Sequence, residues 1–322
     1  MLNIPIELLD TIRTKNNILI AGVGGGFDVY GGIPLYYTLQ KLGKNIVFAN
    51  YSFTDVNEAV GSCGAEVIAN NLFIAKPDFN NNISYYPEGY LAKFLKTGLQ
   101  EDVPVYMFAK TGTNPLTNAY KYIIEEHQID LIILIDGGVD SLNTGAETGH
   151  GTIIEDSISL AALAQIDVKK IVMCVGFGTE VEEKVCGHNV LMNMANIIKN
   201  NGFIGSCSLT KNSNSFKLYR NACLFAFSEQ ELNRTSHIHR RILPAVEGEF
   251  GDFHMTDEDL DKEIFISPFM SICWFFHYEC VFMYNKIIPH VSDSENFFDV
   301  VQRVMPYIES EKSKIPYNSI PY

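Results

Sequence analysis

The pattern that most constrains the fold is a series of six short apolar runs, each followed by a segment with helical periodicity. Strand-like runs that alternate with amphipathic helices are typical of βαβ units, in which the strands pair in parallel. The sequence therefore predicts an α/β fold, Rossmann-like, with a mostly parallel, doubly wound sheet. The strands are expected at Asn17–Gly22, Ile46–Asn50, Glu66–Ala75, Val103–Phe108, Leu131–Ile135 and Lys170–Val175.

The domain organisation follows from a change of composition near Asn200, where NNGFIGSCSLTKNSNS is typical of a loop. We expect one Rossmann-like domain over residues 1–322, with residues 201–322 as a helical C-terminal embellishment that completes the ligand crevice. Residues 264–288 are the most apolar segment, but Pro268, His277 and Glu279 interrupt it, so it is predicted to be a buried core helix and not a membrane helix. Residues 75–87 are predicted to form an exposed loop or lid.

Composition restricts the class of partner. The chain has 322 residues, of which 47% are hydrophobic and 19% charged, as in an ordinary globular protein. Its net charge of −14 disfavours nucleic acids and anionic membranes as partners and leaves a homo-oligomer open. The seven cysteines contain no C-x-x-C pair, and the N-terminus lacks the features of a signal peptide, so we expect buried thiols and a cytoplasmic protein.

A glycine-rich turn joins the first strand to the first long helix, in the sequence GVGGGFDVYGGIP. Glycines can adopt positive φ and let backbone N–H groups approach an anion, and the helix that begins near Ile33 adds its positive end. Pro34 falls in the first helical turn, where the missing N–H costs least. The turn is predicted to hold a diphosphate through Gly24, Gly25, Gly26 and Asp28.

Two further glycine-punctuated loops follow later strands. Because the carboxyl ends of parallel strands meet at one edge of a sheet, these loops should share one ligand crevice with the first. The loop after Leu131–Ile135 supplies Gly137, Gly138, Asp140 and His150. The loop after Lys170–Val175 supplies Gly178, Thr179 and Glu180.

The acidic residues of the second loop have three possible interpretations. Asp140 and His150 are predicted to be catalytic, with His150 beside a general base. Alternatively, Mg²⁺ is bound by carboxylates, and the ligands are then Asp136, Asp140, Glu147 and Asp156. The structural reading is that Asp140 and Asp156 cap helices, while Thr152 and Glu155 form a capping box at a helix that begins at Ile153.

Other residues could extend the site. Thr111 and Thr113 precede a helix that opens at Pro115, so they are predicted to cap it or to contact a ribose or phosphate. In the second half, Arg234, His237, His239 and Arg240 could reach phosphates, and His254 could act as an acid or base. The alternative for this segment is a surface helix with a solvated basic face.

The loops together resemble those of the sirtuin and deoxyhypusine-synthase class of NAD-binding folds. The first loop matches the sirtuin spacing at Gly24, Gly26, Gly32, Ile33 and Pro34. Residues 139–142 match the stretch that lines the nicotinamide pocket, His150-Gly151 is similar to the catalytic His-Gly pair, and Gly178-Thr179 resembles the loop at the adenosine ribose. No D-F-R follows Pro34 and the zinc-binding cysteine pairs are absent, so the resemblance implies NAD binding and argues against protein deacetylation.

The chain also resembles, over nearly its whole length, the family called domain of unknown function 1152. The matching segments are GGGFDVYGGIPL (24–35), FAKTGTNPL (108–116), LIDGGVDSL (134–142), GTIIEDSISLAA (151–162), HRRILPAVEGEFGDFH (239–254) and SPFMSICWFF (267–276). This resemblance implies a fold and carries no activity.

The sequence therefore predicts a protein that binds NAD or a related nucleotide and cleaves or transfers at its ribosyl bond, with Asp140 and His150 at the ribose. Three alternatives remain open. The first is a metal-assisted hydrolase of a phosphorylated small molecule, and the second is a nucleotide-sensing regulator without turnover. The third is a redox dehydrogenase, for which Asp55 could bind a ribose.

Overall fold

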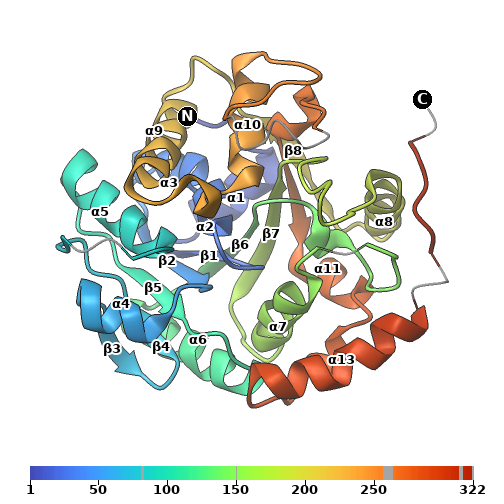
Figure 1. The fold of residues 1–322 in the computed structure, drawn as a ribbon, viewed down its shortest axis with the longest axis horizontal. Coiled ribbons are helices and arrows are strands. Elements are labelled where there is room, and N and C mark those ends of the chain that lie inside the picture. Colours follow the sequence, from blue (N-terminus) through green and yellow to red (C-terminus); the bar gives the residue numbers. More distant parts are fainter. Residues whose placement is uncertain (81–82, 150, 257–263, 312–314, 321–322) are drawn as a thin grey trace.

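A mixed sheet runs through the centre of the molecule (Figure 1). The structure is a computed structural model that describes residues 1–80, 83–149, 151–256, 264–311 and 315–320. The strands are β1 (Asn17–Gly22), β2 (Asn45–Tyr51), β3 (Glu66–Ala69), β4 (Leu72–Ile74), β5 (Val105–Phe108), β6 (Leu131–Asp136), β7 (Lys169–Val175), β8 (Phe203–Ser208) and β9 (Ile272–His277). In the described residues they form one nine-stranded sheet in the order β3-β4-β5-β2-β1-β6-β7-β9-β8.

The centre of the sheet is parallel. Strands β5, β2, β1, β6 and β7 pair in parallel, whereas β3 and β4 at one edge and β9 and β8 at the other pair antiparallel. From β1 the chain first builds outward through β2 and β5, and then returns to place β6 and β7 on the other side of β1. The predicted α/β class with a mostly parallel sheet is confirmed.

Helices cover both faces of the sheet because neighbouring residues of each buried strand point to opposite sides. Ile18 and Ile20 of β1 belong to one apolar core, and Leu19 and Ala21 to the other. The first core contains residues of α1 (Ile6–Arg13), α2 (Asp28–Gly31), α3 (Ile33–Lys41), α4 (Val56–Cys63), α5 (Pro87–Leu99), α9 (Asn214–Glu229) and α10 (His237–Glu247). The second contains residues of α6 (Thr113–His127), α7 (Ile153–Leu163), α8 (Gly187–Lys199), α11 (Tyr278–Tyr284), α12 (Ile288–Val291) and α13 (Phe297–Glu311).

The C-terminal third contributes strands as well as helices, which corrects the sequence prediction. Residues 203–208 were expected to be loop but form the edge strand β8. The expected core helix over residues 264–288 is instead a short 3-10 helix η4 (Pro268–Ser271), then β9, then α11. Strand β9 is apolar because it lies between β7 and β8, where Cys273, Phe275 and Phe276 are buried. Within the described segments, every helix is too short or too polar to cross a bilayer.

Two smaller predictions also need correction. The expected strand over residues 66–75 is a hairpin, because Asn71 adopts a φ of 63° and reverses the chain between β3 and β4. The expected exposed lid over residues 75–87 is anchored by apolar side chains, since Phe79, Ile83 and Tyr86 are buried. All seven cysteines are free thiols; five of them are buried as predicted, whereas Cys207 and Cys280 are only partly buried.

Candidate functional site

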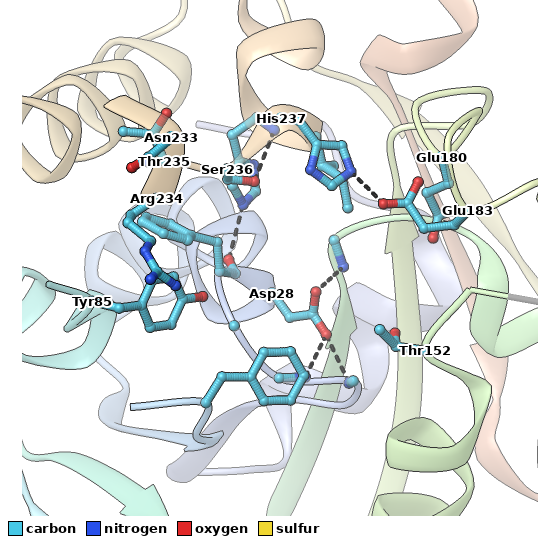
Figure 2. Close-up of a pocket in the computed structure, with 18 of the residues that line it drawn as sticks. Asp28, Tyr85, Thr152, Glu180, Glu183, Asn233, Arg234, Thr235, Ser236 and His237 are labelled. Atoms are coloured by element: carbon cyan, nitrogen blue, oxygen red, sulfur yellow. Dashed lines mark hydrogen bonds and ion pairs between the residues drawn. The ribbon is translucent and has the colours of Figure 1, made fainter. Parts of the chain in front are cut away.

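The candidate site lies where the direction of chain winding reverses, between the neighbouring strands β1 and β6. In open α/β sheets such a point leaves a crevice at the carboxyl ends of the strands. A cavity of about 500 Å³ is found there, lined by the loops that follow β1, β2, β6 and β7 and by the start of α10 (Figure 2). The volume is within the range of small-molecule sites.

Arg234, His237 and His239, which were predicted to reach phosphates, line this cavity. So do seven residues predicted on the three glycine-rich loops, which are Gly24, Gly25, Gly26, Asp28, Gly137, Asp140 and Glu180. Their positions are 24–28, 137–140 and 180, so three loops far apart in the sequence share one crevice. The loops meet because β1, β6 and β7 are adjacent and parallel.

The amides of the first loop are already occupied by a side chain. Asp28 Oδ2 accepts hydrogen bonds from the backbone N–H of Gly24 at 2.7 Å and of Gly25 at 3.0 Å, and its Oδ1 accepts one from Gly137 N–H at 3.2 Å. Two of the glycines bend the loop into this form, with φ of 104° at Gly25 and 59° at Gly26. The amides predicted to bind a diphosphate therefore hold the Asp28 carboxyl group and join the loops after β1 and β6.

Asp140 and Glu180 both lie on the floor of the cavity, close enough for each carboxyl group to shift the pKa of the other. Asp140 lies on the 3-10 helix η1 (Asp140–Leu142), and its Oδ2 accepts hydrogen bonds from Thr152, from the backbone N–H and from Oγ1 at 3.0 Å. Glu180 Oε2 accepts a hydrogen bond from Val139 N–H at 2.7 Å. Burial and the charge of Asp140 hold the pKa of Glu180 well above its usual range.

Two more carboxyl groups lie below this floor. Asp136 is 1% exposed and accepts hydrogen bonds from the backbone N–H and hydroxyl of Ser141. Asp156, on α7, is fully buried. Burial, together with the charges of neighbouring carboxylates, raises the pKa of Asp136, Asp140 and Asp156, and raises the pKa of Asp28 to about 8. The site thus concentrates acidic groups in a low-dielectric region.

The opposite wall carries cationic and aromatic groups. Arg234 is exposed and lies beside Tyr85 in Figure 2, and the helix α10 begins next to it at His237. His237 Nε2 pairs with Glu183 Oε1 at 2.9 Å. The rings of Phe53 and Tyr85 face the loop glycines: a Cβ on Gly25 would lie 2.9 Å from the Phe53 ring, and a Cβ on Gly26 would lie 3.0 Å from the Tyr85 hydroxyl.

His239 also lines the cavity and has a structural role. Burial lowers the pKa of its imidazole to about 4, so the ring is neutral. Its Nε2–H donates to the Phe27 carbonyl at 2.9 Å, and Nδ1 accepts from the Tyr219 hydroxyl at 2.6 Å. The helix α10 is largely buried, so the alternative of a surface helix with a solvated face is wrong.

The structure places several predicted ligands outside the cavity lining. Glu147 is satisfied by hydrogen bonds from Thr144, Gly145 and Asn193, so the predicted metal set that includes it is not assembled. Within the described chain, the other predicted residues outside the lining are Thr111, Thr113, Asp136, Gly138, Asp156, Gly178, Thr179 and Arg240. His150 lies outside the described residues.

The hydrogen bonds of these residues explain their positions. The Thr111 carbonyl accepts from the Tyr51 hydroxyl, and Thr113 Oγ1 donates to the Val291 carbonyl. Thr179 is fully buried, with its hydroxyl on the Gly176 carbonyl, and Arg240 donates to Thr256 Oγ1. His254 pairs with Asp252.

The predicted capping box at α7 is also corrected. Thr152 is the N-cap residue, but its hydroxyl donates to Asp140 and makes no cap hydrogen bond. Glu155 pairs instead with Lys110 Nζ at 2.8 Å. The side chain that accepts from the start of α7 is therefore Asp140, which links this helix to the cavity floor.

Sequence reasoning missed the aromatic wall and Glu183. Phe53 follows the carboxyl end of β2, so the rule that was applied to the other strands could have identified it. Tyr85 comes from the segment before α5, and no local pattern marks it. Glu183 could have been identified only by its proximity in the sequence to Glu180, on the loop after β7.

The fold and site together define a mostly parallel α/β protein with an acidic small-molecule crevice at the reversal point of its sheet. The profile of one family, described as protein of unknown function (DUF1152), matches residues 89–310. The match covers more than half of the chain, so the chain belongs to this family. No match was found among curated proteins. The matched residues include Asp140, Asp156 and Glu180, whereas Asp28 precedes them.

Proposed function

We propose that this protein is an enzyme that binds NAD or a related nucleotide and cleaves or transfers at its ribosyl bond. The observation that carries the proposal is the presence of two buried carboxyl groups, Asp140 and Glu180, on the floor of the crevice. In this proposal Asp140 keeps the catalytic role predicted from the sequence. Glu180, which was predicted to contact the nucleotide, acts instead as the general acid. The Rossmann-like character of the sheet and the sirtuin-like loop spacing are parts of the same proposal.

The chemistry of a ribosyl bond suits such a pair. Cleavage between the ribose and its base develops positive charge on the sugar, and enzymes of glycosidic bonds use one carboxylate and one carboxylic acid around it. Asp140, whose charged form is stabilised by the hydrogen bonds that it accepts from Thr152, would face the sugar as the carboxylate. Glu180, whose pKa is raised well above its usual range by burial and by the charge of Asp140, would donate the proton to the leaving base.

The remainder of the cavity would hold the rest of a nucleotide. The Phe53 and Tyr85 rings offer surfaces on which a base could stack. Arg234 and the N-terminal end of α10 offer a guanidinium and a positive dipole end to the phosphates. Since Asp28 occupies the amides of Gly24 and Gly25, we place the diphosphate at this wall and not at the first loop.

A second candidate is a metal-assisted hydrolase of a phosphorylated small molecule. It is favoured by the charge of the lining, which includes six carboxyl groups: Asp28, Asp55, Glu58, Asp140, Glu180 and Glu183. A phosphate would enter such a cavity more readily with a divalent cation.

A thermal-shift screen with NAD, ADP-ribose and sugar phosphates tests both candidates, because a ligand that binds only the native state adds about 2.7 kcal/mol at a hundred times its dissociation constant. Chromatography of the same mixtures should show free nicotinamide from NAD. Phosphate release that EDTA abolishes would favour the hydrolase, and stabilisation without product would indicate a nucleotide sensor. A protein that ignores every nucleotide at millimolar concentration would refute the nucleotide proposal.

The basic wall can be tested by Arg234→Met. We expect this variant to bind NAD or ADP-ribose at least about tenfold more weakly, since a charge-assisted hydrogen bond contributes roughly 1.5–3 kcal/mol. Arg303→Met is the matched control because Arg303 pairs with Asp299 on α13. Titration calorimetry that gives equal affinity for both variants would remove Arg234 from the site.

A further inference from the structure

Asp156 has no partner for either of its carboxyl oxygens. The residue is fully buried, and both Oδ1 and Oδ2 are inaccessible to solvent and without a hydrogen bond in the described structure. A buried carboxyl group without a partner destabilises the folded state, because folding removes its hydrogen bonds to water and no protein group replaces them. Such a group in a native protein calls for a ligand that the chain itself does not supply.

The unpartnered oxygen points toward other oxygen atoms. Asp156 Oδ1, Thr152 Oγ1 and Asp28 Oδ2 all lie within 3.0 Å of the single point where a Cβ of Gly24 would be. Asp140 Oδ2 is 3.0 Å from the same Thr152 hydroxyl. Three carboxyl groups and a hydroxyl from α2, η1 and the start of α7 therefore converge beside Gly24, which lines the cavity.

Three basic groups are paired with other acids, and Arg234 lies on the opposite wall of the cavity beside Tyr85. Lys110 pairs with Glu155, Arg241 with Glu182, and His237 with Glu183. Among the described residues, no Lys, Arg or His forms an ion pair with Asp28, Asp140 or Asp156.

We propose that Asp28, Asp140, Asp156 and Thr152 bind one hydrated divalent cation of the Mg²⁺ or Mn²⁺ type. Carboxylate and hydroxyl oxygens are hard ligands, which these ions prefer. In the described chain, Glu182, Glu183 and His237 form a group whose ligand atoms all lie within 4.8 Å of one another. The carboxyl oxygens of Asp28, Asp140 and Asp156 do not form such a group, so they are more widely spaced. That spacing suits an ion that keeps several waters and takes one or two carboxylates directly.

The cation site goes beyond the proposed function and stands without it. The ligand set differs from the one predicted from sequence, because Asp28 and Thr152 replace Asp136 and Glu147. In the proposed enzyme, the cation would lie next to Asp140, where it can bind a ribose hydroxyl or a phosphate oxygen of the substrate.

Metal binding can be measured without any nucleotide. Protein dialysed against EDTA and then against metal-free buffer is titrated with MnCl₂, and free Mn²⁺ is followed by electron paramagnetic resonance. We expect one bound Mn²⁺ per chain, competition by MgCl₂, and a higher melting temperature with either ion. No binding at millimolar Mn²⁺ would overturn the proposal, and the nucleotide screen would remain to be judged by its own result.

The variant Asp156→Asn tests whether Asp156 is a metal ligand or only a structural residue. It should weaken Mn²⁺ binding by at least about tenfold, and it should raise the melting temperature in EDTA because it removes a buried, unpartnered acid. Asp10→Asn, which removes an exposed acid outside the cavity lining, should keep the wild-type affinity. Affinity unchanged in Asp156→Asn, or lost only in Glu183→Gln, would refute this site. If Asp156→Asn does not fold, Thr152→Val provides a second test, because Thr152 is exposed. This variant should bind Mn²⁺ about tenfold more weakly, and an unchanged affinity would also refute the site.

Discussion

Replacing Asp140 by Asn should lower the turnover of ribosyl-bond cleavage by about a hundredfold or more, while the affinity for nucleotide stays within a few-fold. The change keeps the shape of the side chain and an acceptor for Thr152 N–H, but removes the negative charge that would face the developing positive charge on the sugar. Single-turnover rates and equilibrium titrations with NAD measure the two quantities separately.

The control for this variant is Glu58→Gln, which changes a carboxyl group at the same cavity and should keep normal turnover. Circular dichroism must show an intact fold, because Asp140 also holds the start of α7. A well-folded Asp140→Asn protein with normal turnover would make Asp140 structural. Catalysis on that loop would then fall to His150.

The stability of the metal-free protein should fall as the pH rises from about 4 to about 8. Burial and the charge of Asp140 raise the pKa of Asp28 to about 8, against about 3.9 in an unfolded chain. Between these values the native state binds the proton and the unfolded state does not, so unfolding releases it and is favoured by higher pH. One such group lowers the free energy of unfolding by roughly 1.4 kcal/mol per pH unit.

Urea unfolding at a series of pH values in EDTA measures this dependence. Asp28→Asn should make the plot of unfolding free energy against pH flatter, whatever it does to the absolute stability, while the surface variant Asp10→Asn should keep the wild-type slope. An Asp28→Asn plot with the same slope as that of the wild type would show that Asp28 is ionised in the native state. The raised pKa would then be wrong.

The parallel centre of the sheet could be predicted because its strands are buried on both faces and are apolar throughout. Strands β1, β6 and β7 appear in the sequence as uninterrupted apolar runs of strand length. The antiparallel edge could not be predicted in the same way. Strand β8 alternates between partly buried and exposed residues and contains Gly205, and β9 continues directly into α11, so neither has a clear boundary in the sequence.

The parts of the candidate site that follow from the order of the parallel strands could be predicted from the sequence. The parts that depend on individual side-chain contacts could not. Placing Gly24, Asp140 and Glu180 at one crevice needs only the parallel strand order. The occupation of the first loop by Asp28, and the hydrogen bond from Thr152 to Asp140, depend on distances that no spacing pattern encodes. Glu147 was misassigned because an acidic residue that folds back onto its own loop has the same local sequence context as a ligand.

Gly24 and Gly138 are spacers, since neither has the positive φ that explains Gly25 and Gly26. A Cβ on Gly138 would lie 2.6 Å from the Glu180 carboxyl oxygens, and one on Gly24 would collide with Asp156. Any side chain there would displace an acid. In homologous sequences each glycine and its carboxyl group should therefore change together, so that a family member with alanine at position 138 or 24 should also have lost the acid at 180 or 156.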